Sequence, residues 1–313
     1  MRSVSRVLGL VPLVLLVSCA GSLPPDSDSG CQATSVDLTE ELTSSSAEAL
    51  LQLNCYRQRM NGTPAQISPA LSEAAQLHAE YLEATGAWGH GEDDPSIPSY
   101  RGATPGERAT AAGFPIDDNL QSITELVGFH SDGADASDAV DLWFNTVYHR
   151  LPLATPQLEA VGFGQAGIYD VMLVVSPWEA SADGPDFLVH GYPAAGQAGV
   201  PTSFDSDREV PDPTPDRGEV GFPISLTFLD QGFHQPDNLY GLTVDENTSV
   251  LRGPDGNPIE TLLLTPSTDA LIRRSAVLLP VEPLLPKTSY EVRLQGTVGE
   301  SPFEEFWSFE TGD

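Results

Sequence analysis

The pattern of apolar residues predicts an amphipathic helix over residues 139–147, and the rest of the first half of the chain is arranged around it. The apolar positions recur at intervals of three and four residues and so share one helical face: Ala139, Val140, Trp143, Phe144 and Val147. His149 and Arg150 follow this stripe directly. A proline-broken connection then leads to a short apolar run over residues 161–164, which favours a strand.

Helical periodicity and capping residues predict three further helices before this one, over residues 46–60, 68–86 and 104–113. Ser68 is the N-cap and Pro69 the first residue of the second helix, while Gly86 ends it. His78 lies on the apolar face of that helix, which indicates a hydrogen-bonded core histidine rather than a ligand. A nearly continuous apolar run over residues 169–178 predicts a strand buried on both faces.

In the last third of the chain, the pattern of apolar residues predicts strands and no helix. Apolar or alternating runs cover residues 224–229, 260–264, 276–280, 289–294 and 305–309, and turn residues such as those at 253–257 separate them. Residues 197–217 are rich in proline and aspartate and show no periodicity, so we interpret them as a linker. The prediction is therefore a first domain over residues 38–196 and an all-β domain over residues 218–313.

The N-terminus resembles an export signal. Two arginines precede an apolar run that is too short for a stable membrane span, so residues 1–19 are predicted to be a lipoprotein signal peptide that is not part of the fold. The run ends in Leu16-Val17-Ser18-Cys19, which resembles the bacterial lipobox and predicts a lipid on Cys19. Ordinary cleavage nearby, which would give a secreted protein, is the alternative. Residues 20–37 have the composition of a flexible tether.

The net charge bears on which partners the protein can bind, and the cysteines bear on whether it contains a disulfide. The formal net charge of -31 would repel a polyanion, so nucleic-acid binding is excluded as a function. In an exported protein, Cys31 and Cys55 are candidates for a disulfide. The alternative is that Cys55 is a buried small apolar residue.

The order of several motifs resembles the CAP (SCP-like) superfamily, in the form found in secreted bacterial proteins. The matching stretches are Asn54-Cys55-Tyr56-Arg57, residues 71–82, His90, residues 100–113, Glu125, residues 143–150 and residues 161–164. The resemblance covers about residues 46–180. It implies an α/β fold, an α-β-α sandwich, with a central cleft.

The resemblance also implies a set of cleft residues. His90 and His149 match the two histidines of the family, and Glu125 matches the first of its two acids. Thr146 stands where many members have the second acid, and Trp143 is expected to line the cleft. Some members bind a divalent metal there, so the tentative ligands of Zn²⁺ or another divalent cation are His90, His149 and Glu125. The alternative is that both histidines hydrogen-bond to Glu125 and hold loop and helix together.

Residues 285–290 and 307–312 resemble bacterial Ig-like domains of extracellular proteins, which act as spacers or adhesion modules. The sequence thus predicts an exported protein, lipid-anchored to the bacterial cell envelope, at the outer membrane or the cell surface. Its function is predicted to be non-enzymatic binding of an extracellular protein, lipid or envelope component, displayed by the Ig-like domain. The alternatives are a metal-assisted hydrolase using the same cleft and a lipid or sterol carrier.

Overall fold

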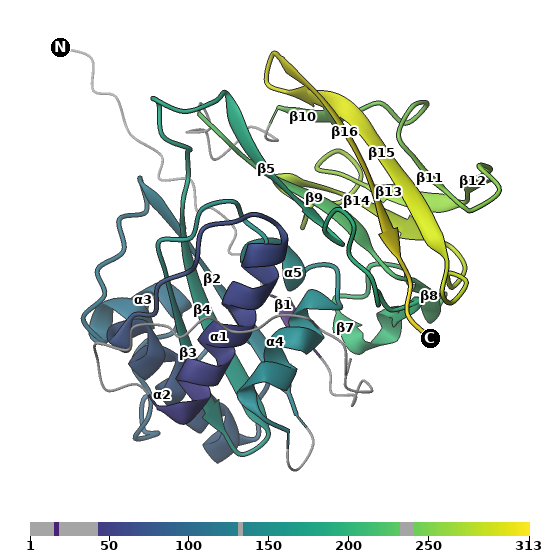
Figure 1. The fold of residues 1–313 in the computed structure, drawn as a ribbon. Coiled ribbons are helices and arrows are strands. Elements are labelled where there is room, and N and C mark those ends of the chain that lie inside the picture. Colours follow the sequence, from purple (N-terminus) through teal and green to yellow (C-terminus); the bar gives the residue numbers. More distant parts are fainter. Residues whose placement is uncertain (1–15, 19–42, 131–133, 232–240) are drawn as a thin grey trace.

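The computed structural model describes residues 16–18, 43–130, 134–231 and 241–313. The first part is a five-stranded sheet in the order β3-β4-β2-β1-β7 with helices on both faces (Figure 1). Its strands are β1 (Leu16–Ser18), β2 (Gln121–Phe129), β3 (Ala160–Ala166), β4 (Tyr169–Pro177) and β7 (Glu209–Val210). Its helices are α1 (Ser44–Arg59), α2 (Pro69–Thr85), α3 (Pro105–Ala111), α4 (Ala136–Phe144) and α5 (Arg150–Leu153). The predicted α-β-α arrangement is confirmed.

Two cores separate the helices into layers. Trp143 and Phe144 of α4 pack with α1 on one face of the sheet, together with Phe163 of β3. On the other face, α2 packs against β4 through a second cluster that contains Val171 and Leu173. β4 is buried on both faces from Tyr169 to Ser176, as its continuous apolar run predicts.

The helix ends follow the sequence signals. The Ser68 side chain accepts a hydrogen bond from the backbone N–H of Leu71, and Gly86 ends α2 in a left-handed conformation with φ 64°. Thr104 and Glu107 form both hydrogen bonds of the predicted capping box. These local interactions need no tertiary contact, which is why the sequence predicted them.

Two glycines let β3 lie directly against α2. A Cβ atom at Gly162 would stand 2.2 Å from the carbonyl carbon of Leu71, and one at Gly164 would stand 2.1 Å from the backbone nitrogen of Gln76. Any side chain at either position would force the strand away from the helix. The glycine-flanked run over residues 161–164 is therefore a packing feature.

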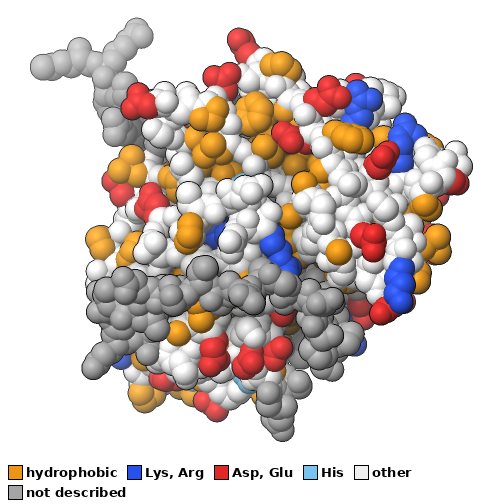
Figure 2. Space-filling model, in the orientation of Figure 1, with side chains coloured by type: hydrophobic (Ala, Val, Ile, Leu, Met, Phe, Trp, Pro, Cys, Tyr) orange, Lys and Arg blue, Asp and Glu red, His pale blue; other side chains and the backbone are white. Residues whose placement is uncertain are grey.

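The second part consists of antiparallel strands in two sheets, consistent with a β sandwich (Figure 1). One sheet has the order β13-β14-β9-β5, and the other has β10-β15-β11-β12 with β16 paired to β15. The strands are β5 (Phe187–Tyr192), β9 (Ile224–Asp230), β10 (Leu242–Val244), β11 (Val250–Arg252), β12 (Pro258–Ile259), β13 (Thr261–Leu264), β14 (Ser275–Pro280), β15 (Ser289–Val298) and β16 (Ser301–Glu310). Acidic side chains are scattered over the face shown in Figure 2, as the net charge leads one to expect.

The segment between the two parts differs from a free linker. β5, inside the predicted first domain, pairs along its whole length with β9 of the second sheet. Within the predicted linker over residues 197–217, β6 (Ser203–Asp205) pairs with β8 (Glu219–Gly221), and β7 joins the first sheet through β1. Backbone hydrogen bonds thus hold this proline-rich stretch, although its composition gives no periodic pattern.

Arg150 joins the two parts through a buried guanidinium. Its Nε donates to the Phe144 carbonyl and its Nη1 to the Pro223 carbonyl, each at 2.6 Å. The same group lies 4.8 Å from the ring centres of Tyr192 and Phe222. Burial lowers the pKa of Arg150 to about 10, so the side chain stays charged at neutral pH. One apolar cluster, including Leu50 of α1 and Trp307 of β16, extends across both parts.

Because the two parts share this core, we expect them to unfold in one transition. Replacing Arg150 by Met removes donors from two buried carbonyls and should lower the free energy of unfolding by roughly 2–4 kcal/mol. Urea denaturation followed by tryptophan fluorescence measures this. Arg293→Met is the control, because Arg293 pairs with Glu304 at the surface and should cost at most about 1 kcal/mol. Two separate transitions, or equal effects of both substitutions, would contradict this role of Arg150.

Candidate functional site: two buried histidine–carboxylate pairs

The first pair joins His90, in the loop after α2, to Glu125 on β2. The imidazole Nδ1 lies 3.0 Å from Oε1 of Glu125, and both side chains are buried. Oε2 of the same carboxylate accepts a hydrogen bond from Nη2 of Arg108 at 2.7 Å. Since an ionised carboxylate only accepts hydrogen bonds, Nδ1 of His90 carries the proton. Both oxygens of Glu125 are thus engaged inside the protein.

His78 and Arg108 complete this network. His78 is fully buried on α2, with Nδ1 2.9 Å from Oε1 of Glu92 and Nε2 3.0 Å from the Gly89 carbonyl. Arg108 also donates to the carbonyl of His90 at 3.0 Å and so holds the loop that presents the histidine. The prediction that His78 is a hydrogen-bonded core histidine is confirmed. The sequence analysis missed Glu92 and Arg108, because neither position carries a local signal for burial.

The network keeps Glu125 ionised. Burial alone would raise the pKa of this carboxyl group. The charges of His78 and Arg108 and the hydrogen bond from His90 outweigh burial and lower the pKa from 4.5 to about 2. Glu125 is therefore an anion at neutral and mildly acidic pH, and it is a weak base.

The second pair joins His149 to Glu209, a residue outside the predicted first domain. Nδ1 of His149 lies 2.9 Å from Oε1 of Glu209, and both side chains are fully buried. The carboxylate also accepts hydrogen bonds from the backbone N–H groups of Val147 at 2.8 Å, Tyr148 at 2.7 Å and His149 at 3.1 Å. The predicted alternative, in which both histidines bond to Glu125, is thus correct for His90, whereas His149 has its own carboxylate.

The interaction with Glu209 accompanies an early end of α4. The apolar stripe predicts a helix through residue 147, whereas the structure ends it at Phe144. From residue 147 onward the backbone N–H groups point to Glu209 instead of to carbonyls in the preceding turn. His149 is therefore held by a strand that follows it by sixty residues, not by the helix before it.

Thr146 and Trp143 are used structurally. The Thr146 hydroxyl donates to the Trp143 carbonyl at 2.9 Å, so its proton is not available to a neighbouring base. Trp143 is completely buried in the core and meets Phe163 edge to face, with 6.3 Å between the ring centres. The structure thus places Trp143 inside the α1–α4 layer, where the resemblance implies a cleft-lining residue.

The Nε2 nitrogens of the two histidines are among the buried polar atoms without a hydrogen-bond partner in the described part of the chain, as are Nε of Arg108 and Nε1 of Trp143. In the neutral imidazole that donates from Nδ1 to a carboxylate, Nε2 carries the lone pair. Such a nitrogen can accept a hydrogen bond or bind a metal ion, and a carboxylate behind the ring is the usual support of a metal-binding histidine.

The predicted metal ligands do not form one set. In the part of the chain that the structure describes, no group of three or more His, Cys, Asp or Glu side chains is placed to hold a metal ion. The Nε2 atoms of the imidazoles are suitable ligands for a divalent metal ion. Glu125 is not suitable, because its two oxygens already accept hydrogen bonds from Arg108 and His90. A metal site at His90 and His149 stays a prediction with two protein ligands.

The predicted lipid and disulfide sites lie mostly outside the described residues. Cys55 on α1 is disulfide-bonded, whereas Cys19 and Cys31 both lie outside the described part of the chain. The bond excludes the alternative of a free buried thiol at Cys55, and its pairing with Cys31 stays a prediction. Among the described helices, none is long and apolar enough to cross a membrane.

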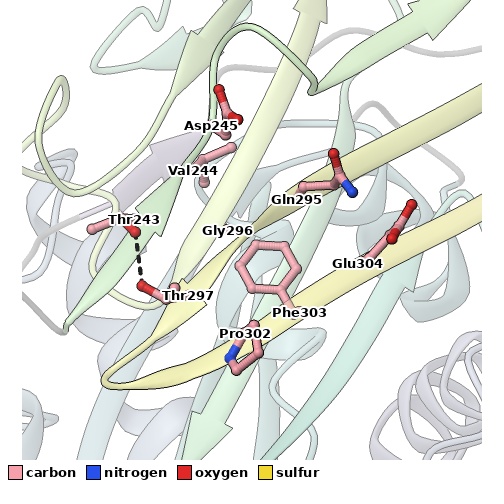
Figure 3. Close-up of a pocket in the computed structure, with 9 residues that line it drawn as sticks. All are labelled: Thr243, Val244, Asp245, Gln295, Gly296, Thr297, Pro302, Phe303 and Glu304. Atoms are coloured by element: carbon pink, nitrogen blue, oxygen red, sulfur yellow. Dashed lines mark hydrogen bonds between the residues drawn. The ribbon is translucent and has the colours of Figure 1, made fainter.

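A groove of about 670 Å³ lies elsewhere, on the second domain between β10, β15 and β16 (Figure 3). Thr243 and Thr297 hydrogen-bond to each other at its wall, at 2.8 Å. Its two acidic groups have partners, since Glu304 pairs with Arg293 and Asp245 accepts the backbone N–H of Asn247. Among the described residues that line it, the groove therefore has no acidic group without a partner. The histidine pairs remain the candidate site.

Replacing Glu125 by Gln should destabilise the protein in a pH-dependent way. At neutral pH the variant removes the nearer of the two buried carboxylates beside Arg108 and leaves Glu92, with Oε1 3.6 Å from Nε, so we expect a loss of roughly 3 kcal/mol. Because the folded-state pKa of about 2 lies below the ordinary 4.5, the stabilisation is complete above pH 4.5 and is lost as pH falls toward 2. Urea denaturation at several pH values measures the difference between the two proteins.

The control is Glu304→Gln, which alters an exposed ion pair and should change stability by at most about 1 kcal/mol. A destabilisation by Glu125→Gln that has the same size at neutral and at strongly acidic pH would contradict the assignment of the charge to Glu125.

The comparison with protein-family models agrees with the motif order. The sequence model for "CAP: Cysteine-rich secretory protein family" matches residues 50–173. A structurally similar protein is an extracellular protein containing a SCP domain from Bacillus anthracis str. Ames, with TM-score 0.35, 18% identity, and coverage of 44% of this chain and 45% of that chain. Another is a cysteine-rich secretory protein from Staphylococcus aureus subsp. aureus Mu50, with TM-score 0.30, 15% identity, and coverage of 44% and 41%.

The chain therefore matches less than half of the length of either of these two structures. The search of curated proteins finds no match. The predicted resemblance over about residues 46–180 is confirmed by the family match, which contains His90, Glu125 and His149 but not Glu209. Residues 50–173 of this chain are a CAP domain.

Proposed function

We propose that this protein is an exported, lipid-anchored CAP-domain protein that binds a partner without catalysing a reaction. The observation that carries the proposal is the state of the polar groups at the two histidine pairs. The side chains of Glu125, Glu209 and Thr146 all hydrogen-bond to groups inside the protein. The Nε2 atoms of the two histidines have no such partner among the described residues and can bind a ligand. Such a site can recognise a ligand that donates a hydrogen bond to these nitrogens.

The hydrolase alternative finds less support in these contacts. A general base should have a pKa near the working pH, and the pKa of Glu125 is about 2. A nucleophile needs a base within hydrogen-bond reach, whereas the Thr146 hydroxyl donates to the carbonyl of Trp143. The geometry therefore favours recognition over bond cleavage.

Export is supported by two separate features of the chain. The N-terminal residues have the charge and apolar pattern of a signal peptide that ends at a lipobox-like cysteine. In addition, the disulfide at Cys55 is of a kind that persists in oxidising compartments outside the cytoplasm. In this proposal the β domain displays the CAP domain away from the membrane.

Replacing Cys19 by Ser should abolish lipid attachment. Cells fed with labelled palmitate should incorporate the label into the wild-type protein and not into the Cys19→Ser variant, which should leave the membrane fraction or accumulate with its leader uncleaved. Cys31→Ser is the control and should keep the label, since the lipid is expected on Cys19 alone. A wild-type protein without label would show that the anchor is absent.

Weak binding of a divalent metal is a second candidate function, favoured by the unpartnered Nε2 atoms of His90 and His149. Protons compete with zinc for these nitrogens, so calorimetry should detect zinc binding at about pH 7.5 and much weaker binding at about pH 5.5. The double variant His90→Ala/His149→Ala should lose binding, while His130→Ala, whose ring contacts Asp170, should keep it. Zinc binding that survives the double substitution would place the metal elsewhere.

A further inference from the structure

The strand β1 occupies the interior of the first sheet, although its residues belong to the predicted leader. It pairs in parallel with β2, where Leu16 and Val17 lie opposite Leu126 and Val127. On its other side it pairs antiparallel with β7, where Val17 lies opposite Val210. Figure 1 shows this short purple strand between the two. If the leader is cut before Cys19, the sheet loses a strand from its interior.

The mature sheet would then have two unpaired edges that face each other. Neighbouring strands lie about 4.8 Å apart, so β2 and β7 would be separated by roughly 9–10 Å, the width that one strand fills. Unpaired N–H and C=O groups on such edges are a template for another strand. We call the space between Leu126–Val127 and Glu209–Val210 the strand gap.

The two sides of the strand gap are held without help from β1. β2 pairs with β4 along its full length, from Gln121 to Phe129. β7 is held by the Glu209 carboxylate, which accepts three backbone N–H groups of residues 147–149. Each side therefore keeps contacts of its own when β1 is absent, while β7 loses the strand through which it joins the sheet.

The surroundings of the strand gap determine what can fill it. Leu126 and Val127 are both fully buried, and they belong to the cores on opposite faces of the sheet. An incoming strand thus meets apolar groups on both faces and must itself be apolar or small, as the sequence Leu-Val-Ser is. Each side also carries one histidine pair, with His90 bound to Glu125 and His149 bound to Glu209.

We propose that the processed protein binds an extended apolar peptide segment in the strand gap, as a replacement strand parallel to β2 and antiparallel to β7. Main-chain hydrogen bonds to both edges supply the affinity, and the two buried cores select apolar side chains. This inference rests on the proposed function, because it requires that the leader be removed. It names the partner as polypeptide in extended form.

The test uses protein purified from the cell envelope and a fluorescein-labelled peptide of residues 13–18 with added N-terminal arginines for solubility. Fluorescence anisotropy should show saturable binding. Methylating the amide nitrogen of Val17 removes a main-chain donor at the paired position and should weaken binding by about tenfold or more. Methylation at Leu13, outside the paired residues, should leave the affinity within about twofold. The Cys19→Ser precursor, which keeps its own β1, should bind the peptide at least about tenfold more weakly.

Mass analysis of the N-terminus separates the two ways in which the inference can fail. If the purified protein retains residues 16–18, the leader prediction is wrong and the strand gap does not exist. If the chain begins at Cys19 and the peptide does not bind, the proposed function stands and the replacement-strand inference is overturned. Equal affinity for both methylated peptides would also overturn it, because binding would then not use the backbone of the paired residues.

Discussion

The buried carboxylate of Glu209 is the interaction on which the arrangement of the two domains and of the candidate site depends. It accepts hydrogen bonds from three consecutive backbone N–H groups and from the ring of His149. A buried carboxylate is stable only where such donors are supplied together, so the loop after α4 and the strand β7 must fold against each other. One side chain thereby orients His149 and fixes the segment between the domains.

In both histidine pairs the Nδ1 atom lies against a buried glutamate, but the two glutamates come from different parts of the chain. Glu125 comes from the CAP domain itself, next to Arg108 and His78. Glu209 comes from beyond the residues that match the family. The segment after the CAP domain thus supplies the carboxylate that holds His149. His149 therefore has its carboxylate partner only because the chain continues beyond residue 173 to Glu209.

Continuity of the core explains why the second domain is not simply a spacer attached by a tether. Arg150 and the aromatic rings of Tyr192 and Phe222 join the layers, and the apolar cluster of α1 and α4 continues to Trp307. The sequence does not reveal this shared core, because the connecting residues are rich in proline and aspartate and show no periodic apolar pattern. The two parts should therefore move as one body.

Features that depend on neighbours along the chain could be predicted from the amino-acid sequence. Helix caps at Ser68 and Thr104, the doubly buried β4 and the motif order of the CAP domain all follow from periodicity and local hydrogen bonds. Only the tertiary structure decided the partner of His149, the end of α4 at Phe144 and the place of β5 beside β9. Each of these depends on a contact between residues far apart in sequence, and a lone glutamate such as Glu209 looks the same whether solvent or three backbone amides surround it.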